Sequence, residues 1–424
     1  MKKLNHSIGS RAKMGIVKTK NIRVESRVGL DIDITVRRAD GSVRLEKTEE
    51  GHSFLGNFIK TFYAAAMMHH APNVDGAAMT LTDTGGTARA GSSSACLITE
   101  AQATVMDCNA AVAIATYGIL VGTDTGAVYP KDIANYKLGT QIAHGTGAGQ
   151  LSHSNHSIVG SSVTATDSIA GITRTFANVS GGSITVNEIG LASKMNWESS
   201  TDRYFMLIRD LLAAPVVVAH GESLTISYRI KCTINTNVGG FIRQFVSLMA
   251  RQWAQVADIC KDTAGQTLTL GACPWPFWMT SHGGYGRNVQ FLVGSGWSNS
   301  GEADNMGIVI GSDGSAVSPA HYNMIAQIRS GEIAGTMMYY GTAVYGCEIN
   351  VGADTAFFLV EAMFKNVSGG TITVNEVGLV CQGLIPNDSY PNANLYCIAR
   401  NKVAATAVAD DETLRVTYTI SIAT

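Results

Sequence analysis

The chain has 424 residues, a formal net charge of −2 at pH 7 and 45 glycines, and only 15% of its residues are charged. The net charge implies no general affinity for nucleic acid, and no apolar run approaches the roughly 20 residues that span a membrane. A lightly charged, glycine-rich chain fits an all-β protein that buries surface in an assembly better than it fits a solitary soluble enzyme.

Residues 1–27 form a basic segment. Eight bases against Glu25 alone give it a local charge of +7, which leaves −9 for the remainder. Such an arm could dock on an acidic neighbour or on nucleic acid, or it could only aid solubility. We expect no signal peptide, because Lys and Arg interrupt the first apolar cluster. The residues expected to dock are Lys2, Lys3, Arg11, Lys13, Lys18 and Lys20.

A sequence repeat dominates the rest of the chain. NVSGGSITVNEIGL (178–191) returns as NVSGGTITVNEVGL (366–379) with two conservative changes. Further anchors recur in the same order at offsets between 183 and 190, which indicates an internal duplication. These anchors are GILVGTDTGAVYP (118–130) with GIVIGSDGSAVSP (307–319), SLTISYRI (223–230) with TLRVTYTI (413–420), NFIKTF (57–62) with GFIRQF (240–245), and TLT (80–82) with TLT (267–269).

Each copy has the same predicted order of elements. A strand at 31–40 or 226–234 precedes a helix at 54–68 or 241–257, where apolar residues recur at helical spacing. A glycine-rich stretch and a series of short strands follow. We therefore predict a mainly β protein made of two tandem duplicated β-sandwich domains, each with one helix packed on it. The expected boundaries are 28–230, with an insertion at 71–112, and 231–424, with an aromatic insertion at 261–306.

The repeated segment reads as a hairpin. Ser-Gly-Gly supplies the positive φ angles of a tight turn between two alternating runs. Glu188 and Glu376 fall in the otherwise apolar second strand. We interpret each as an edge or interface residue that sets the strand register, in preference to a catalytic carboxylate.

Asp124-Thr-Gly resembles half of a two-lobed aspartic protease site, where two carboxylates share one proton. Asp313 stands at the matching position of the second copy. It is followed by Gly-Ser, which breaks the required triplet, so both stretches read better as turns between strands. No catalytic residue is predicted.

Other candidate sites are weak. His153 with His156, and His69 with His70, have ligand-like spacing but no partnering Cys or carboxylate pattern, so they are interpreted as polar loop residues and no metal or other cofactor is expected. Asn178 and Asn366 start glycosylation-like triplets but are interpreted as turn residues. The eight cysteines form no CxxC pair and are expected to be free and mostly buried.

An aromatic cluster distinguishes the second copy. Four of the five tryptophans lie between residues 253 and 297, whereas the matching 71–112 stretch is rich in Ala, Gly, Ser and Thr. Such a cluster can be local core, a subunit interface or a platform for sugar rings. The candidate contact residues are Trp275, Phe277, Trp278, Tyr285 and Trp297.

The first copy has the pattern G-I-x-V-G-[ST] with a later Tyr, then N-x-S-G-G-x-I-T-V-x-E-[VI]-G-L, an Arg-bearing strand and a final T-x-x-Y-x-I strand, and the second copy keeps it except for Ile310 and Arg415. In this pattern the chain resembles a β-sandwich module of structural proteins from tailed bacteriophages. The matching residues of the first copy are 118–136, 173–191, 204–210 and 224–230. Those of the second are 307–322, 362–379, 396–401 and 414–420.

The resemblance implies a non-enzymatic component of the particle, such as a head-decoration, collar or tail-fibre protein. Its expected partners are further copies of itself and other virion proteins, and its expected location is the virion, after assembly in the host cytoplasm. The chain has no heptads or shaft repeats, so it is not expected to be a whole long fibre. The alternative function is binding of a host-surface glycan or receptor through the aromatic insertion.

Overall fold

The computed structural model describes residues 18–51, 53–67, 80–90, 106–197, 201–254, 258–270, 306–350, 355–384 and 393–422. Within these ranges the protein is mainly β, as predicted. The first half of the chain contains β1 (Thr19–Arg37), β2 (Val43–Gly51), α1 (Gly56–Met67), β3 (Thr80–Thr82), β4 (Ala88–Ala90), β5 (Gly118–Gly122), β6 (Ser152–Val163), β7 (Asp167–Ala177), β8 (Ile184–Trp197), β9 (Thr201–Val218) and β10 (Ser223–Thr233). The second half contains β11 (Gly239–Phe241), α2 (Arg243–Ala254), β12 (Asp258–Lys261), β13 (Thr267–Leu270), β14 (Gly307–Gly311), β15 (Met338–Asn350), β16 (Thr355–Lys365), β17 (Ile372–Leu384), β18 (Ala393–Val408) and β19 (Thr413–Ile422).

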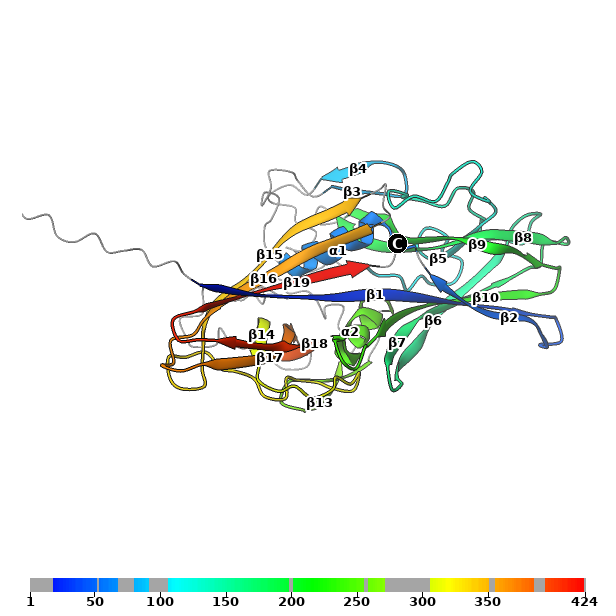
Figure 1. Ribbon diagram of the computed structural model, residues 1–424. Helices are drawn as coiled ribbons and strands as arrows, with labels where there is room; N and C mark the ends of the chain where they lie inside the picture. The colour runs from blue at the N-terminus through cyan, green and yellow to red at the C-terminus, as the bar shows by residue number, and fades with distance from the viewer. Residues whose placement is uncertain are drawn as a thin grey trace, which may run out of the picture.

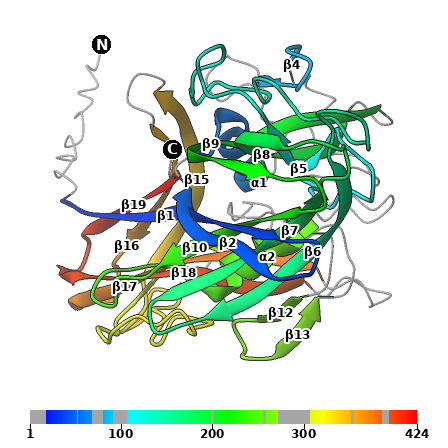
Figure 2. The ribbon, with the colours of Figure 1, turned by 90° about the vertical axis from the view of Figure 1, so that its right-hand side faces the viewer.

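One large sheet joins the two halves. Its strands follow the order β15, β16, β19, β1, β10, β7 and β6, with β2 paired to β1 beside this path. The order is symmetric about β1, because β15, β16 and β19 are the repeats of β6, β7 and β10. In Figure 2, β15 and β16 lie in the left half of the molecule and β6 and β7 in the right half.

Strand β1 serves both copies. Gly29–Arg37 pair antiparallel with β10, whereas Thr19–Val28 pair parallel with β19. Alternate residues such as Leu30, Ile32 and Ile34 are buried, as expected for a strand with one face in the core. The first 10 residues of β1 therefore complete the second copy's part of the sheet, and in Figure 1 the strand crosses most of the molecule.

Each copy also contributes a smaller sheet. The first consists of β5, β8 and β9, and the second of β11, β18, β17 and β14. The two sheets lie toward opposite ends of β1 in Figure 1. β5 and β14 are buried at every position, which explains their unbroken apolar sequences.

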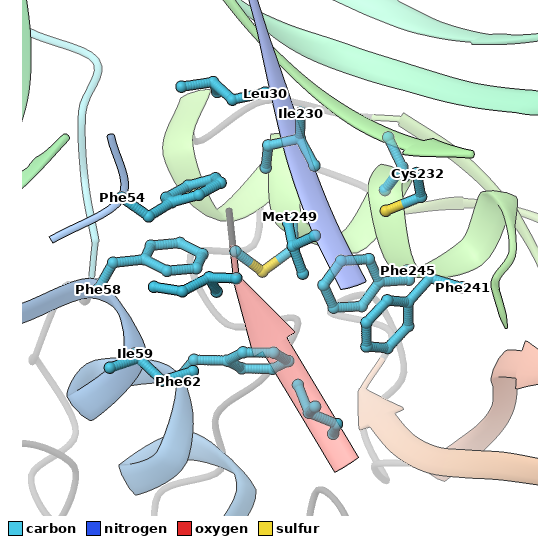
Figure 3. Packing of buried hydrophobic residues seen from close by; sticks show 14 of the residues in the cluster. Leu30, Phe54, Phe58, Ile59, Phe62, Ile230, Cys232, Phe241, Phe245 and Met249 are labelled. Atoms are coloured by element: carbon cyan, nitrogen blue, oxygen red, sulfur yellow. The ribbon is translucent and has the colours of Figure 1, made fainter. Parts of the chain in front are cut away.

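The helices cross between the copies. α1 contacts β9 of its own copy and β15 and β16 of the other, while α2 contacts β18 of its own copy and β6 and β7 of the other. Their apolar faces meet, with the rings of Phe62 and Phe245 5.6 Å apart and those of Phe58 and Trp253 6.5 Å apart. Figure 3 shows these phenylalanines between the two helices. A single hydrophobic cluster consequently contains residues of both copies.

Three sequence expectations change. Residues 19–27, assigned to the basic arm, form strand β1, with Ile22 buried against the core. Residues 226–233 close the first copy as β10 rather than opening the second. The helix anchor also shifts by one turn, because Phe54 bridges Ile208 just as Phe241 pairs with Ala399, an offset of 187 in place of 183.

Candidate functional site

The two repeated glutamates are buried at the centre of a charged cluster in each copy. Glu188 and Glu376 are both 0% exposed. Each stands opposite a glycine, Gly122 or Gly311, in the pairing of β8 with β5 and of β17 with β14. A Cβ atom on Gly122 would lie 2.4 Å from Glu188 Oε1, and one on Gly311 would lie 2.3 Å from Glu376 Oε1. The last glycine of the G-I-x-V-G motif therefore makes room for the carboxylate.

In the first copy the partner of this carboxylate is Arg209 on β9. Its Nε donates to Glu188 Oε2 at 3.0 Å, and its Nη2 lies 2.9 Å from the same oxygen. The guanidinium also donates to Asn135 Oδ1 at 2.8 Å and contacts Asp124 Oδ2 at 3.3 Å. The Glu188 oxygens in turn accept from the backbone N–H groups of Gly139 and Thr140. The cluster ties the loop between β5 and β6 to the small sheet.

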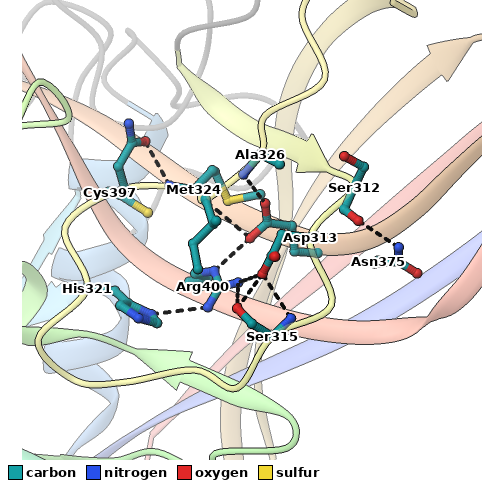
Figure 4. Close-up of polar contacts among 12 residues, drawn as sticks. Ser312, Asp313, Ser315, His321, Met324, Ala326, Asn375, Cys397 and Arg400 are labelled. Carbon is teal, nitrogen blue, oxygen red and sulfur yellow. Dashed lines mark hydrogen bonds and ion pairs between the residues drawn. The ribbon is translucent and has the colours of Figure 1, made fainter. Parts of the chain in front are cut away.

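The second copy repeats the arrangement with different loop residues. Arg400 Nε donates to Glu376 Oε2 at 2.6 Å, and Nη2 lies 2.9 Å from Asp313 Oδ2 (Figure 4). His321 occupies the place of Asn135, with its Nδ1 3.1 Å from Arg400 Nη1. Ala326 N–H donates to Glu376 Oε1 at 2.9 Å. The same Glu–Arg–Asp set is thus built twice.

The repeated acidic residues have structural roles within their own copy. The glutamates lie in the interior and fasten loops, whereas we had interpreted them as edge or interface residues. Asp124 and Asp313 each bind the arginine of their own copy, so they do not share a proton as the aspartates of a protease do. Arg209 and Arg400 were not predicted as partners. The signal that could have found them is an arginine in the strand after the glutamate in both copies.

The repeated asparagines hold the hairpin turns. Asn178 is 0% exposed and donates through Nδ2 to the carbonyls of Gly182 and Val218. Its Oδ1 accepts from the N–H and the hydroxyl of Ser180. Asn366 makes the same four contacts in the second copy. Both residues act within turns, as predicted.

A second buried polar cluster exists in the first copy. Arg174 is 1% exposed and donates to four backbone carbonyls, including those of Ile119 and Ser154. His156 accepts from Ile119 N–H through Nε2 at 2.7 Å, so its Nδ1 carries the proton and donates to Ala110 O. Burial lowers the pKa of His156 to about 3.

His153 lies in the same cluster. Burial, with the nearby charge of Arg174, lowers its pKa to about 4. These histidines belong to strand β6 and to the core, whereas we had interpreted them as polar loop residues. No group of three His, Cys, Asp or Glu side chains in the described ranges is arranged to hold a metal ion.

The remaining candidates divide between described and undescribed residues. Lys20 is exposed on β1, and Lys18 immediately precedes that strand. The six described cysteines are free, and five of them are buried. No helix in the described residues is long and apolar enough to cross a membrane. The candidates outside the described residues are Lys2, Lys3, Arg11, Lys13, His69, His70, Trp275, Phe277, Trp278, Tyr285 and Trp297.

Comparison with known protein families, with curated proteins and with solved structures finds no match to this chain.

Proposed function

We propose that the protein is a non-enzymatic structural component of a bacteriophage particle. Each copy is a β-sandwich module with a helix packed on it, and the two modules form one rigid block. Copies of the block associate with one another and with other virion proteins. The chain carries no chemistry in this proposal; it provides shape and surface.

The observation that carries the proposal is the use to which the repeated residues are put. The asparagine, the glutamate and the arginine are buried in both copies, and their hydrogen bonds go to turns and loops of the same copy. A general base must reach a substrate proton, but the oxygens of Glu188 already accept from Arg209 and two backbone N–H groups. Repeated residues whose polar groups all bond within the fold have a structural role, as expected in a protein that acts as a scaffold.

The shared interior supports a block rather than two mobile modules. β1 pairs with strands of both copies, and α1 and α2 each contact both. Such an arrangement transmits load across the chain without a linker. It suits a fixed element of a head, neck or tail surface.

Quantitative mass spectrometry of purified phage particles tests the proposal. We expect the chain in stoichiometric amounts relative to the major shell subunit. A copy number close to that of the shell would indicate head decoration, and a number close to one ring would indicate a collar, tail or fibre base. Its absence from particles would refute the proposal.

A further inference from the structure

The second copy contains a groove that the buried clusters do not use. It is an open hollow of about 530 Å³ between the β16–β17 turn, the start of β17 and the loop before β15. Small and polar residues line most of it. They include Ser312, Ala334, Gly335, Thr371 and Thr373, and the apolar Ile328 also lines the groove.

One wall of the groove is an open strand edge. Ile372, Thr373 and Val374 pair with β18 on one side. On the other side β14 begins to pair only at Glu376, where Gly311 is the partner. No further strand pairs with residues 372–374 in the described part of the chain. An extended peptide can add to such an edge through its backbone.

The rim of the groove is more apolar than its counterpart in the first copy. The loops correspond residue by residue, because His144 bridges Leu151 as Ser330 bridges Met337. At the position of Gly147 the second copy carries Ile333, which is 73% exposed and lies next to two lining residues. Ile325, 53% exposed, replaces Gly139 in the same loop but does not line the groove. Ile333 therefore gives the groove of the second copy apolar surface that a docked segment can bury.

The chain enters the fold beside this groove. Thr413 N–H donates to Lys18 O, which places the start of β1 at the β18–β19 turn. In that turn Asp410 accepts from Gly369 N–H, and Gly369 lines the groove. Figure 1 shows the start of β1 and both turns at the same end of the molecule. Seventeen extended residues reach at most about 60 Å, so residues 1–17 can span to the groove of an adjoining copy.

Charge favours the same pairing. Residues 1–17 contain Lys2, Lys3, Arg11 and Lys13 and no acid. The rim of the groove carries the exposed acids Glu332 and Asp410 and the exposed base Arg329, while Lys365 is held by Asp411 at 2.7 Å. The rim keeps an excess of negative charge and the segment is basic, so docking is favoured electrostatically.

We propose that residues 1–17 of a second copy bind in this groove as a strand added to the edge of β17. The segment and the groove lie at the same end of the molecule, so two copies facing end to end exchange segments reciprocally and the contact closes as a pair. This inference rests on the proposed assembly function and names the contact through which copies join.

Sedimentation velocity on the full chain over a range of concentrations tests the exchange. We expect reversible pairing of the unaltered protein. Ile333→Gly, which restores the residue of the first copy, weakens it at least about tenfold, because a buried isoleucine is lost from the contact. Val128→Gly, at an 85% exposed position of the first copy, is the control and leaves pairing unchanged.

A second variant distinguishes a segment that binds the groove of another copy from a segment that binds the groove of its own chain. Changing Lys2, Lys3, Arg11 and Lys13 together to Gln removes the charge of the segment and also weakens pairing. Mixed with Ile333→Gly, this variant recovers partial pairing, because one intact segment meets one intact groove. A monomeric unaltered protein, or no recovery on mixing, overturns the inference. Pairing that survives in both variants also overturns the segment exchange, but it leaves the proposed function unaffected. Absence of the chain from phage particles, in contrast, refutes the proposed function.

Discussion

Replacing Arg209 by Met probes whether the buried charge cluster holds the first copy together. The substitution keeps an apolar chain of similar length but removes the guanidinium from Glu188, which stays 0% exposed with only the N–H groups of Gly139 and Thr140 as partners. Loss of one partner of a buried ion pair costs about 3–5 kcal/mol. Asn135 Oδ1 also loses one of its two donors and keeps the N–H of Asp132. We expect the free energy of unfolding to fall by about 4 kcal/mol.

Urea denaturation followed by circular dichroism measures this loss. Arg400→Met should cost a similar amount, because Arg400 contacts Glu376 and Asp313 with the same geometry. Lys365→Ala is the control. It breaks a pair in which the Asp411 side chain is 82% exposed, and exposed pairs contribute less than about 1 kcal/mol.

The double substitution Glu188→Gln with Arg209→Met separates charge from packing. It removes the orphaned carboxylate, so part of the lost stability should return. If Arg209→Met cost no more than Lys365→Ala, the cluster would not hold the loop and the reasoning would be refuted. If the double variant were no more stable than Arg209→Met, the loss would lie in packing.

Three further predictions concern the core. The lowered pKa values of His153 and His156, about 4 and about 3, mean that the unfolded chain binds more protons than the folded one below pH 6.5. Their contribution to stability is complete above that pH and is lost as the pH falls to about 4 for His153 and to about 3 for His156. His153→Tyr, the residue of the second copy, should flatten this dependence of stability on pH by up to about 1.4 kcal/mol per pH unit in denaturation series, and equal slopes would contradict the prediction. Val28→Asp, at a 0% exposed site where β1 passes between the copies, should cost several kcal/mol and shift one cooperative unfolding transition of the whole chain, whereas the exposed Arg23→Asp should not. A two-step denaturation curve in which only one step shifts would show that the copies unfold independently. Burial raises the pKa of the Cys381 thiol and raises that of Cys397 to about 12. Both thiols should therefore react with a thiol reagent only at the rate of global unfolding. Fast labelling of the native protein would contradict this prediction.

Local features of the fold could be predicted because they depend on near neighbours in the chain. The turn at Asn178-Val-Ser-Gly needs a capping asparagine and a positive φ, which Gly181 adopts at 85°. The alternation of Leu30, Ile32 and Ile34 required a half-buried strand. Such signals reach only a few residues along the chain, and they place strands and turns well.

Partner choice could not be predicted in the same way. The alternation of apolar and polar residues along β1 does not show that Thr19–Val28 pair with a strand almost 400 residues later. Such a pattern specifies which face of a strand is buried, but it does not specify the neighbouring strand. For the same reason Glu188 read as an edge residue. A buried carboxylate and an exposed one look identical in sequence until the opposing arginine is placed.

The two copies show which parts of the design are constrained. The Glu–Arg–Asp cluster is retained in both, whereas the Arg174–His156 pair of adjoining strands becomes Ala362 and Thr342 at the matching registers. Both the arginine and the histidine are absent from the second copy, as expected if a buried guanidinium is tolerated only where the surrounding strands and loop direct four carbonyls toward it. The second copy lacks that polar core and instead carries exposed isoleucines at Ile325 and Ile333. Duplication therefore kept the cluster that fastens each loop to its sheet and freed one copy to change its surface. A contact built on that surface is asymmetric within the chain, so each chain offers one groove and one segment.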